Sequence, residues 1–295
     1  MDRLLAVSDE LAAAVAQAGQ STFAVHARPR LPSTGVHWRL GLVVTANHTV
    51  QADEGLTLTR PDGRSAAGTL VGRDPAHDLA VVRVEAADVP VAELADSDAV
   101  RVGHMVLALG SGPRASWGVV SAIGAARTRN AEGDLFSLDL TLYAGFSGGP
   151  LVDAQGRVVG ITTSGISRQM QLAVPATVVS RTVDELVRHG RIPHGYLGVG
   201  TQPVRVPEAM RRQLGLDQEL ALIVVDVQPD SPAAAGLLIG DLILSLDGHP
   251  IADPVELRRL LRAERIGQPI AARVVRAGQA RDVSLTVGER PPRPR

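Results

Sequence analysis

Apolar and polar residues recur along this chain with two different periods, and each period predicts a different element. Between Leu4 and Ala18 the apolar positions follow helical spacing and Gly19 offers a stop, so we expect an amphipathic N-terminal helix within residues 1–20. From there to about residue 163, short stretches rich in Val, Leu, Ile and Thr are separated by turn signals, which is typical of an all-β sandwich or a pair of barrels. The predicted strands span residues 22–27, 39–45, 56–59, 79–84, 105–109, 117–123, 135–138, 150–152 and 158–163.

A helix and a change of composition mark the end of this first domain, which we place at residues 21–190. The helix is predicted from about Thr177 to His189, with Gly190 as its C-terminal stop. The segment after it mixes strands with two helices, so a second, α+β domain is expected over residues 194–288. Its strands are predicted at residues 222–227, 242–246, 270–276 and 282–287.

One helix of the second domain has a clear start signal. Asp253 is a suitable N-cap, Pro254 takes the first helical position, and Glu256 can reach back to the N-cap. The leucines that then share one face of this helix are Leu257, Leu260 and Leu261. Residues 289–295 are too polar and proline-rich to pack, so an extended, solvated tail is expected there.

The composition removes whole branches of chemistry. The 295 residues contain no cysteine and no lysine, and all 30 basic residues are arginine. This excludes a disulfide framework, a thiolate nucleophile, a Walker phosphate loop and a Schiff base. Serine, threonine, histidine, carboxylates and arginine remain, and no cofactor or metal is expected. Thirty basic against 31 acidic residues give a net charge of −1, so neither nucleic acid nor an anionic membrane is an expected partner.

Hydropathy bears on the location of the protein. No run of about 18 uninterrupted apolar residues occurs, so no transmembrane helix is predicted. The first residues lack the basic start and the apolar stretch of a secretory signal. Two locations stay open: the cytoplasm, or the periplasm or another extracytoplasmic space if an export segment precedes the given sequence.

The strongest local signal is a serine within a glycine cluster, Ser147 in the segment GFSGGPLVD that starts at Gly145. Glycines allow a tight turn and let main-chain N–H groups converge on one point, which is what stabilising an oxyanion beside a serine nucleophile requires. Taken alone, the cluster fits a plain glycine-rich turn equally well. Two other segments change this balance.

His48 and Asp78 are the candidate partners of that serine. His48 ends the segment VVTANH, so a strand holds its imidazole at a rigid rim, where it could act as the base that a serine hydroxyl needs. Asp78 starts a strand predicted to be buried, within DPAHDLAVV, and its carboxylate there needs a hydrogen-bond partner such as an imidazole N–H. Seen alone, Asp78 is better interpreted as a strand-initiating cap. The order His, Asp, Ser is that of chymotrypsin-type enzymes rather than of subtilisin or the α/β-hydrolases.

These three segments, with a C-terminal module that opens GYLGVG, resemble the HtrA (DegP/DegS-type) family, in which a trypsin-like serine protease domain precedes a PDZ domain. The resemblance covers nearly the whole chain after about residue 20. It implies a mainly β fold, with a chymotrypsin-like double β-barrel followed by an α+β PDZ domain. By the same resemblance His48 is the general base, Asp78 its orienting partner and Ser147 the nucleophile in the cleft between the barrels, and the N–H groups of Gly145 and Ser147 form the oxyanion hole.

The stretch before the nucleophile departs from the family pattern. Family members usually read Asn-Pro-Gly-Asn-Ser, whereas this chain reads YAGFS. The N–H donors of Gly145 and Ser147 are retained, but we expect the bulk of Phe146 to bias the loop between a productive and a collapsed state. The change therefore bears on resting activity more than on chemical competence.

Two further segments carry the expected specificity. Trypsin-like enzymes that cut after Arg or Lys have an aspartate six residues before the nucleophile, where this chain has Thr141, followed by Leu142. A pocket lined by these side chains favours a small or medium apolar residue. Thr163, Ser164 and Gly165 match the strand that pairs with the substrate backbone in such proteases. We therefore expect cleavage at hydrophobic residues of unfolded proteins.

The second domain contains a candidate peptide site. Tyr196, Leu197, Gly198 and Val199 resemble the carboxylate-binding loop of PDZ domains and the strand after it. In such a site a sheet edge beside a helix accepts a peptide C-terminus by strand addition, and loop N–H groups bind the terminal carboxylate. The three helix leucines named above either face the peptide or form the buried stripe of their own helix.

Three functions are compatible with these residues. The first is an HtrA-type serine endopeptidase that cleaves misfolded or unstructured polypeptides through an acyl-enzyme, for which the resemblance also implies a homotrimer and a PDZ domain that tethers substrate or regulates the protease. The second is a protease-like scaffold, inactive or active only after a switch, that acts mainly as a peptide-binding protein. The third, an esterase for small acyl compounds, leaves the peptide-binding module unexplained.

Overall fold

The chain divides into two compact units, Met1–Ile192 and Pro193–Arg295. The computed structural model describes residues 2–29, 31–112, 114–124, 135–167, 169–193 and 195–291. The last four residues of the predicted tail lie outside these ranges. Among the helices so described, none is both long and apolar enough to cross a membrane.

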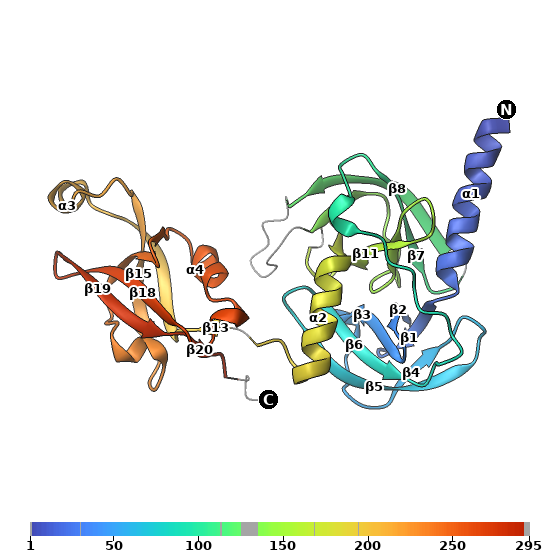
Figure 1. Ribbon diagram of the computed structural model, residues 1–295, viewed down its shortest axis with the longest axis horizontal. Helices are drawn as coiled ribbons and strands as arrows, with labels where there is room; N and C mark the ends of the chain where they lie inside the picture. The colour runs from blue at the N-terminus through green and yellow to red at the C-terminus, as the bar shows by residue number, and fades with distance from the viewer. Residues whose placement is uncertain are drawn as a thin grey trace. The chain divides into compact units, whose positions relative to one another are not determined.

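The first unit opens with the expected amphipathic helix, α1 (Asp2–Gly19). Its C-terminal half buries Ala14 and Ala18 against the unit, whereas Leu4 and Leu5 are 80% and 60% exposed. The N-terminal half of α1 accordingly stands clear of the barrels in Figure 1. At the other end, the hydroxyl of Thr22 donates to the carbonyl of Ala18 (2.8 Å) and ends the helix with a satisfied carbonyl.

The first closed barrel has six antiparallel strands in the order β1-β2-β3-β6-β5-β4. They are β1 (Thr22–His26), β2 (Ser33–Arg39), β3 (Leu42–Ala46), β4 (Leu56–Thr59), β5 (Ser65–Asp74) and β6 (Leu79–Val84). The strand predicted at 39–45 is wrong at its start, because Arg39 ends β2 and Gly41, with φ +70°, lies between β2 and β3. The sequence also does not predict β2 and β5, because their residues are mainly Ser, Thr, Gly, Ala and His rather than an apolar alternation.

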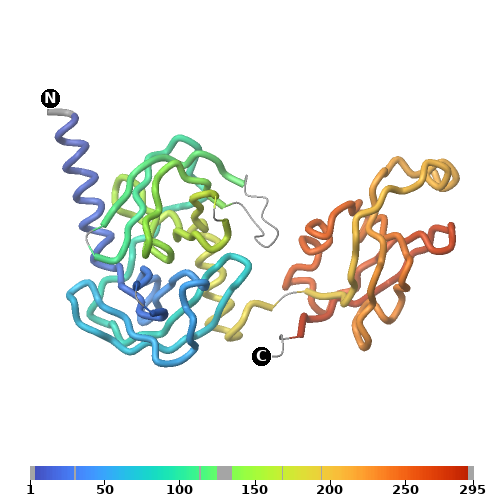
Figure 2. The backbone as a smooth tube through the Cα atoms, turned by 180° about the vertical axis from the view of Figure 1, so that it is seen from behind, coloured from blue at the N-terminus to red at the C-terminus, as the bar shows by residue number. Residues whose placement is uncertain are grey.

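The second closed barrel has the order β10-β11-β12-β9-β8-β7 and lies beside the first in both views (Figures 1 and 2). Its strands are β7 (Met105–Gly110), β8 (Arg114–Ile123), β9 (Phe136–Asp139), β10 (Pro150–Val152), β11 (Val158–Thr163) and β12 (Gln171–Pro175). The sequence predicts all of these except β12, which leads into the next helix with no turn signal between them. The two barrels confirm the expected double β-barrel.

Helix α2 (Ala176–His189) closes the first unit and packs against both barrels. Its buried stripe, which includes Val179, Val183 and Leu186, joins apolar residues from β2, β3, β6, β7, β11 and β12 in one core cluster. Gly190 ends the helix in the left-handed conformation (φ +69°), and its N–H donates to the carbonyl of Leu186 (2.8 Å). The predicted helix and its glycine stop are confirmed, and the helix fixes the two barrels to each other.

The second unit is the expected α+β domain. Its main sheet has the order β14-β15-β16-β18-β19, with β17 paired to β16, and a separate pair joins β13 to β20. The strands are β13 (Gly195–Tyr196), β14 (Val199–Arg205), β15 (Leu220–Val227), β16 (Leu242–Leu246), β17 (His249–Pro250), β18 (Pro269–Arg276), β19 (Gln279–Thr286) and β20 (Gly288–Glu289). The α-helices are α3 (Glu208–Leu214) and α4 (Pro254–Leu260).

The start of α4 has the predicted chemistry. Asp253 accepts from the N–H of Val255 (2.6 Å), and the carboxylate of Glu256 accepts from the N–H of Asp253 (3.2 Å), which makes a capping box. Leu257 and Leu261 are buried in the core of this unit, which also contains Leu197. The helix is thereby fixed against the sheet, beside strand β14.

Candidate active site

His48 lies at the rim of the first barrel, directly after a strand that is buried along its whole length. Strand β3 ends at Ala46, and a short 3-10 turn, η1 (Asn47–Thr49), carries the histidine. The N–H of Asn47 donates to the carbonyl of Asp78 (2.9 Å), and the hydroxyl of Thr49 donates to the carbonyl of Ala46 (2.7 Å). These bonds fix the backbone on both sides of His48, as the sequence analysis expects for a side chain at a rigid rim.

Asp78 lies next to His48 because β3 and β6 are paired, with Ala46 opposite Leu79. The carboxylate of Asp78 accepts the N–H of His48 at Oδ1 (2.8 Å), and Nδ1 of His48 lies 2.6 Å from Oδ2. The hydroxyl of Thr163 also donates to Oδ2. Asp78 is only 5% exposed, so these donors satisfy a charge that would otherwise be costly to bury.

The turn that leads into Asp78 contains a second aspartate–histidine pair that the sequence analysis did not single out. Asp74, 1% exposed, accepts from the N–H of Ala76 (3.0 Å), and Nδ1 of His77 lies 2.7 Å from its Oδ2. Burial raises the pKa of Asp74, but the hydrogen bonds from His77 and Ala76 outweigh it and hold the pKa below the usual value. At the end of this turn Asp78 has a left-handed backbone conformation (φ +56°), and the hydrogen bonds to Asp74 stabilise the turn in that conformation.

Ser147 lies on a loop that is tied to both barrels. Its carbonyl accepts from the N–H of Thr34 on β2 (3.1 Å), and the N–H of the next residue, Gly148, donates to the carbonyl of Thr162 on β11 (2.8 Å). The Oγ atom of Ser147 lies 2.9 Å from Oγ of Ser164, whose N–H also points to it (3.3 Å). In the part of the chain that the structure describes, no hydrogen bond joins Ser147 to His48.

The loop before Ser147 is shaped by two residues at the predicted oxyanion hole. Gly145 has φ +92°, a conformation suited to glycine, and its carbonyl accepts from the hydroxyl of Thr34 (2.6 Å). Phe146 is 1% exposed and packs in the core of the second barrel rather than toward solvent. Over the described residues, neither the N–H of Gly145 nor that of Ser147 donates a hydrogen bond, so both donors are unused.

Comparison with known proteins identifies the family of this chain. Residues 33–161 match the trypsin-like peptidase domain family, and residues 195–287 match the PDZ domain family. The solved structure of an HtrA-type protease, AlgW with a tripeptide, is 32% identical and has a TM-score of 0.78, covering 96% of this chain and 98% of that one. The chain belongs to the HtrA family of serine proteases.

Two curated HtrA relatives agree with this assignment. They are probable periplasmic serine endoproteases, DegP-like, from Halomonas elongata and Brucella suis, 33% and 34% identical over 261 and 279 aligned residues. The alignments cover 85% and 90% of this chain but 55% and 54% of those proteins. The chain thus spans about half the length of the curated relatives it matches.

The residues expected to bind substrate in this HtrA chain lie around the same loop. Thr141 is exposed, and Leu142 packs partly buried against the apolar cluster that contains Phe146. Strand β11 ends at Thr163, so Ser164 and Gly165 form a bend beside the His48 and Ser147 side chains rather than a continuation of the strand. The contacts of this bend with Ser147 and Asp78 were not predicted, because they depend on how a short loop folds back.

Gly165 faces the pair formed by His48 and Asp78. A Cβ atom at this position would lie 2.5 Å from Nδ1 of His48 and 2.5 Å from Oδ2 of Asp78, which is closer than any real Cβ contact. The N–H of Gly165 donates to the hydroxyl of Thr163 (2.9 Å), the same hydroxyl that reaches Asp78. Only glycine fits here without displacing the imidazole or the carboxylate.

The four residues expected to bind a peptide in the PDZ domain play different parts. Leu197 is buried in the core, so only its backbone is available to a ligand. Gly198 has φ +77°, Tyr196 is hydrogen-bonded through its hydroxyl to Gln228, and Val199 begins β14. Strand β14 pairs on one side with β15 and ends the main sheet, and α4 lies beside it. Among the described strands only β15 pairs with β14, and an open strand edge next to a helix is the geometry that strand addition needs.

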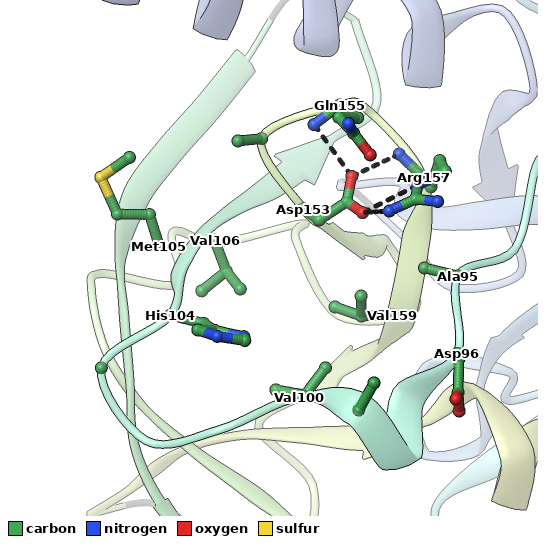
Figure 3. Close-up of a pocket in the computed structure, with 13 residues that line it drawn as sticks. Ala95, Asp96, Val100, His104, Met105, Val106, Asp153, Gln155, Arg157 and Val159 are labelled. Atoms are coloured by element: carbon green, nitrogen blue, oxygen red, sulfur yellow. Dashed lines mark hydrogen bonds and ion pairs between the residues drawn. The ribbon is translucent and has the colours of Figure 1, made fainter.

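A hollow of about 550 Å³ opens elsewhere in the second barrel (Figure 3). Its lining includes Val100, His104 and Val159, and the carboxylate of Asp153 at its edge is bound by Nε of Arg157 (2.9 Å). None of the residues predicted to be catalytic or to bind substrate lines it. The residues of the candidate active site are therefore separate from this hollow.

Proposed function

We propose that this HtrA chain is a serine endopeptidase in which His48, Asp78 and Ser147 act as a catalytic triad on unfolded polypeptide. The observation that carries the proposal is the pair of hydrogen bonds between His48 and Asp78, one from the backbone N–H and one at Nδ1 of the imidazole. The bond at Nδ1 fixes the imidazole in the tautomer that a general base needs. The family assignment supports the same chemistry, because its relatives are serine endoproteases.

The first half of the reaction forms an acyl-enzyme. The hydroxyl of Ser147 turns from Ser164 toward His48 and gives its proton to Nε2 as Oγ attacks the carbonyl carbon of the scissile peptide. The resulting oxyanion accepts hydrogen bonds from the N–H groups of Gly145 and Ser147. The C–N bond then breaks, and the proton on Nε2 leaves with the amine.

The second half releases the new carboxyl end of the substrate. Water gives a proton to Nε2 of His48 and attacks the ester carbon, and the same two N–H groups stabilise the second oxyanion. The ester C–O bond breaks, and the proton returns to Oγ of Ser147. Throughout, Asp78 stabilises the transient imidazolium, and Thr163 and the His48 N–H keep its carboxylate in place.

The hydrogen bond between Ser147 and Ser164 favours a second candidate function, a protease that rests in a switched-off state and binds peptides until it is activated. Ser147 is 7% exposed, and its hydroxyl engages Ser164 instead of a base. Freeing this hydroxyl costs one neutral hydrogen bond, about 0.5–1.5 kcal/mol, and we therefore prefer a resting protease to a permanently inactive scaffold.

Substrate handling follows from the parts around the triad. Misfolded or unstructured polypeptides supply the extended backbone that a protease cleft needs, and the apolar setting of Leu142 beside Thr141 favours small or medium apolar side chains before the cut. A peptide C-terminus would add to β14 of the PDZ domain, with its carboxylate on the N–H groups of the loop Tyr196–Val199. In this way the second unit tethers substrate or regulates the first.

A homotrimer, expected from the family resemblance, remains part of the proposal. The exposed leucines Leu4 and Leu5 at the start of α1 support association, because large apolar side chains at a helix end gain free energy when another copy covers them. Light scattering of the full chain and of a Leu4→Glu, Leu5→Glu variant tests this. A trimer that dissociates in the variant agrees with it, and a monomeric wild type contradicts it.

Degradation of casein, an unfolded protein, tests the proposed activity. The wild type should degrade it, and the Ser147→Ala variant should not. Ser167→Ala removes a hydroxyl that, among the described residues, accepts the backbone N–H groups of Gln169 and Met170 in its own loop, and this variant should match the wild type. Equal and negligible turnover by all three, with peptide binding retained, would favour the scaffold.

A further inference from the structure

Arg114 connects the end of one hairpin to the loop before the nucleophile. Its Nη1 donates to the carbonyl of Ala144 (3.2 Å), and its Nε donates to the carbonyl of Ser111 (3.1 Å). The guanidinium also lies over the ring of Phe146, 5.5 Å from the centroid. The side chain therefore joins the turn between β7 and β8 to the two residues that flank Gly145.

The direction of the Ala144 carbonyl decides what the next N–H can do. In a trans peptide the C=O and N–H groups point in opposite directions, and no described peptide is cis. Because the Ala144 carbonyl points to Arg114, the N–H of Gly145 points away from Arg114, and it donates to no described residue. A half-turn of this peptide would replace the N–H by a carbonyl oxygen and remove the bond to Arg114.

Glycine at position 145 makes such a half-turn possible, so something else must select the orientation. On the carbonyl side of Gly145 the hydroxyl of Thr34 provides one anchor, and the same hydroxyl accepts the N–H of Ser111 (2.8 Å). The peptide before Gly145 has the second anchor, because its carbonyl, that of Ala144, accepts from Arg114. A Cβ at Gly145 would lie 3.2 Å from Nη2 of Arg114, so the guanidinium lies directly against this backbone.

We infer that Arg114 is a positioning residue that holds the Ala144–Gly145 peptide with its N–H available to the oxyanion of the reaction. The inference rests on the proposed function, because an oxyanion forms only if Ser147 attacks a carbonyl. It also assigns a role to Phe146: the buried ring that distinguishes this loop supports the guanidinium that orients it. A bulky residue beside the nucleophile thereby stabilises the productive peptide.

An alternative role for Arg114 is structural, as a cover for Phe146 and the edge of the barrel. The two roles differ in what they change. A positioning role lowers kcat and the affinity for inhibitors that form an oxyanion, and it leaves substrate binding intact. A structural role lowers the melting temperature, and kcat and peptide binding fall together.

The test compares the full-length wild type with Arg114→Ala, Arg114→Lys and the control Arg157→Ala. The control removes Arg157, an arginine of the same barrel whose side chain forms an ion pair with Asp153. The substrate is a fluorogenic peptide that spans a site cleaved in casein. The first probe is the peptide aldehyde of the same sequence, whose adduct with Ser147 carries an oxyanion. The second is the unreactive peptide, which is the substrate peptide itself in a Ser147→Ala background, where its binding is measured without cleavage.

For Arg114→Ala we expect kcat to fall about ten- to a hundredfold, somewhat less than the loss of an oxyanion donor itself, with KM unchanged within about twofold. Aldehyde affinity should fall in parallel, while the binding of the unreactive peptide and the melting temperature stay at wild-type values. Arg114→Lys should recover part of kcat because an ammonium can still donate to the Ala144 carbonyl, and Arg157→Ala should be fully active.

An unchanged kcat in Arg114→Ala, or equal losses of kcat, peptide binding and melting temperature, would overturn the inference while the proposed protease activity stands. A wild type that fails to cleave any casein site and forms no aldehyde adduct would overturn the proposed function itself, and this inference with it. The two failures are therefore distinguishable in a single set of measurements.

Discussion

The hydroxyl of Ser164 lies 2.9 Å from Oγ of Ser147, and the N–H of Ser164 points to the same atom (3.3 Å). A nucleophile in this position must give up one hydrogen bond before it can reach His48. A single neutral hydrogen bond contributes about 0.5–1.5 kcal/mol, so the bond to Ser164 delays the attack without preventing it.

Replacing Ser164 by alanine should therefore speed the first chemical step. We expect Ser164→Ala to raise the single-turnover acylation rate by about two- to tenfold, the kinetic equivalent of one hydrogen bond. Stopped-flow acylation with a chromogenic ester or peptide measures this, with Ser167→Ala as the matched control from the same loop. A rate in Ser164→Ala at or below that of the wild type would show that Ser164 helps the nucleophile instead.

Two described side chains, His48 and Thr163, are hydrogen-bonded to the carboxylate of Asp78. The isosteric change Thr163→Val removes the hydroxyl and leaves the carboxylate less well fixed, so kcat should fall about tenfold. The control is Thr182→Val, because Thr182 is also buried and donates to a buried carboxylate, that of Asp74 (3.4 Å). If both variants lose stability but only Thr163→Val loses kcat, the loss of kcat comes from the weakened hold on Asp78. Equal kcat values in the two variants would contradict this role of Thr163.

Gly165 leaves no space for a side chain beside His48 and Asp78. In Gly165→Ala the imidazole or the carboxylate must move, and even small displacements of a general base are costly, so kcat should drop at least tenfold. Gly19→Ala is the control, because a Cβ at Gly19 meets nothing within 4 Å. Full activity in Gly165→Ala would mean that the bend after β11 moves aside before catalysis.

The PDZ unit contains an ion pair between the buried carboxylate of Asp241 and the partly buried Arg276, and its contribution to stability depends on pH. Burial raises the pKa of Asp241, but the hydrogen bonds from Arg276 (2.7 and 2.8 Å) and from the N–H of Leu238 outweigh it and hold the pKa below 3.8. A folded-state pKa below the unfolded value stabilises the fold above about pH 4, and this contribution is lost as the pH falls below 3.8.

Arg276→Gln should accordingly destabilise the second unit at pH 6 by about 2 kcal/mol, and by clearly less near pH 2.5. A smaller part of the loss persists at low pH, because Arg276 also donates to the carbonyl of Gly236 (2.7 Å). Hydrogen exchange of the β16 and β18 amides in the full chain measures the difference, with the exposed Arg273→Gln on the same strand as control. A loss of equal size at both pH values would contradict the proposed ionic contribution.

The sequence predicted the parts of the fold that have a strong periodic or capping signal. The glycine stop of α2 and the capping box of α4 are local in sequence, and both are present. β2 and β5 were not predicted, because their residues are mostly small or polar. β2 is buried along almost its whole length, whereas β5 is mostly exposed or partly buried, so both strands are specified by their pairing in the closed barrel, which no local pattern shows.

The candidate site divides in the same way. His48 and Asp78 were predictable as a pair because each flanks a buried strand, and those strands are neighbours in the barrel. The bonds from Ser164 to Ser147, from Thr163 to Asp78 and from Arg114 to the Ala144 carbonyl were not predictable. They depend on how three loops fold over one another, and sequence spacing does not specify that.

The central claim is that Ser147 is a nucleophile activated by His48 and Asp78. Its most direct test is covalent labelling with a fluorophosphonate, followed by intact mass and peptide mapping of the full chain. The account predicts one label per wild-type chain, on Ser147, a much slower reaction in His48→Ala and Asp78→Asn, and none in Ser147→Ala. A wild type that stays unlabelled, or a label that persists in Ser147→Ala, would contradict it.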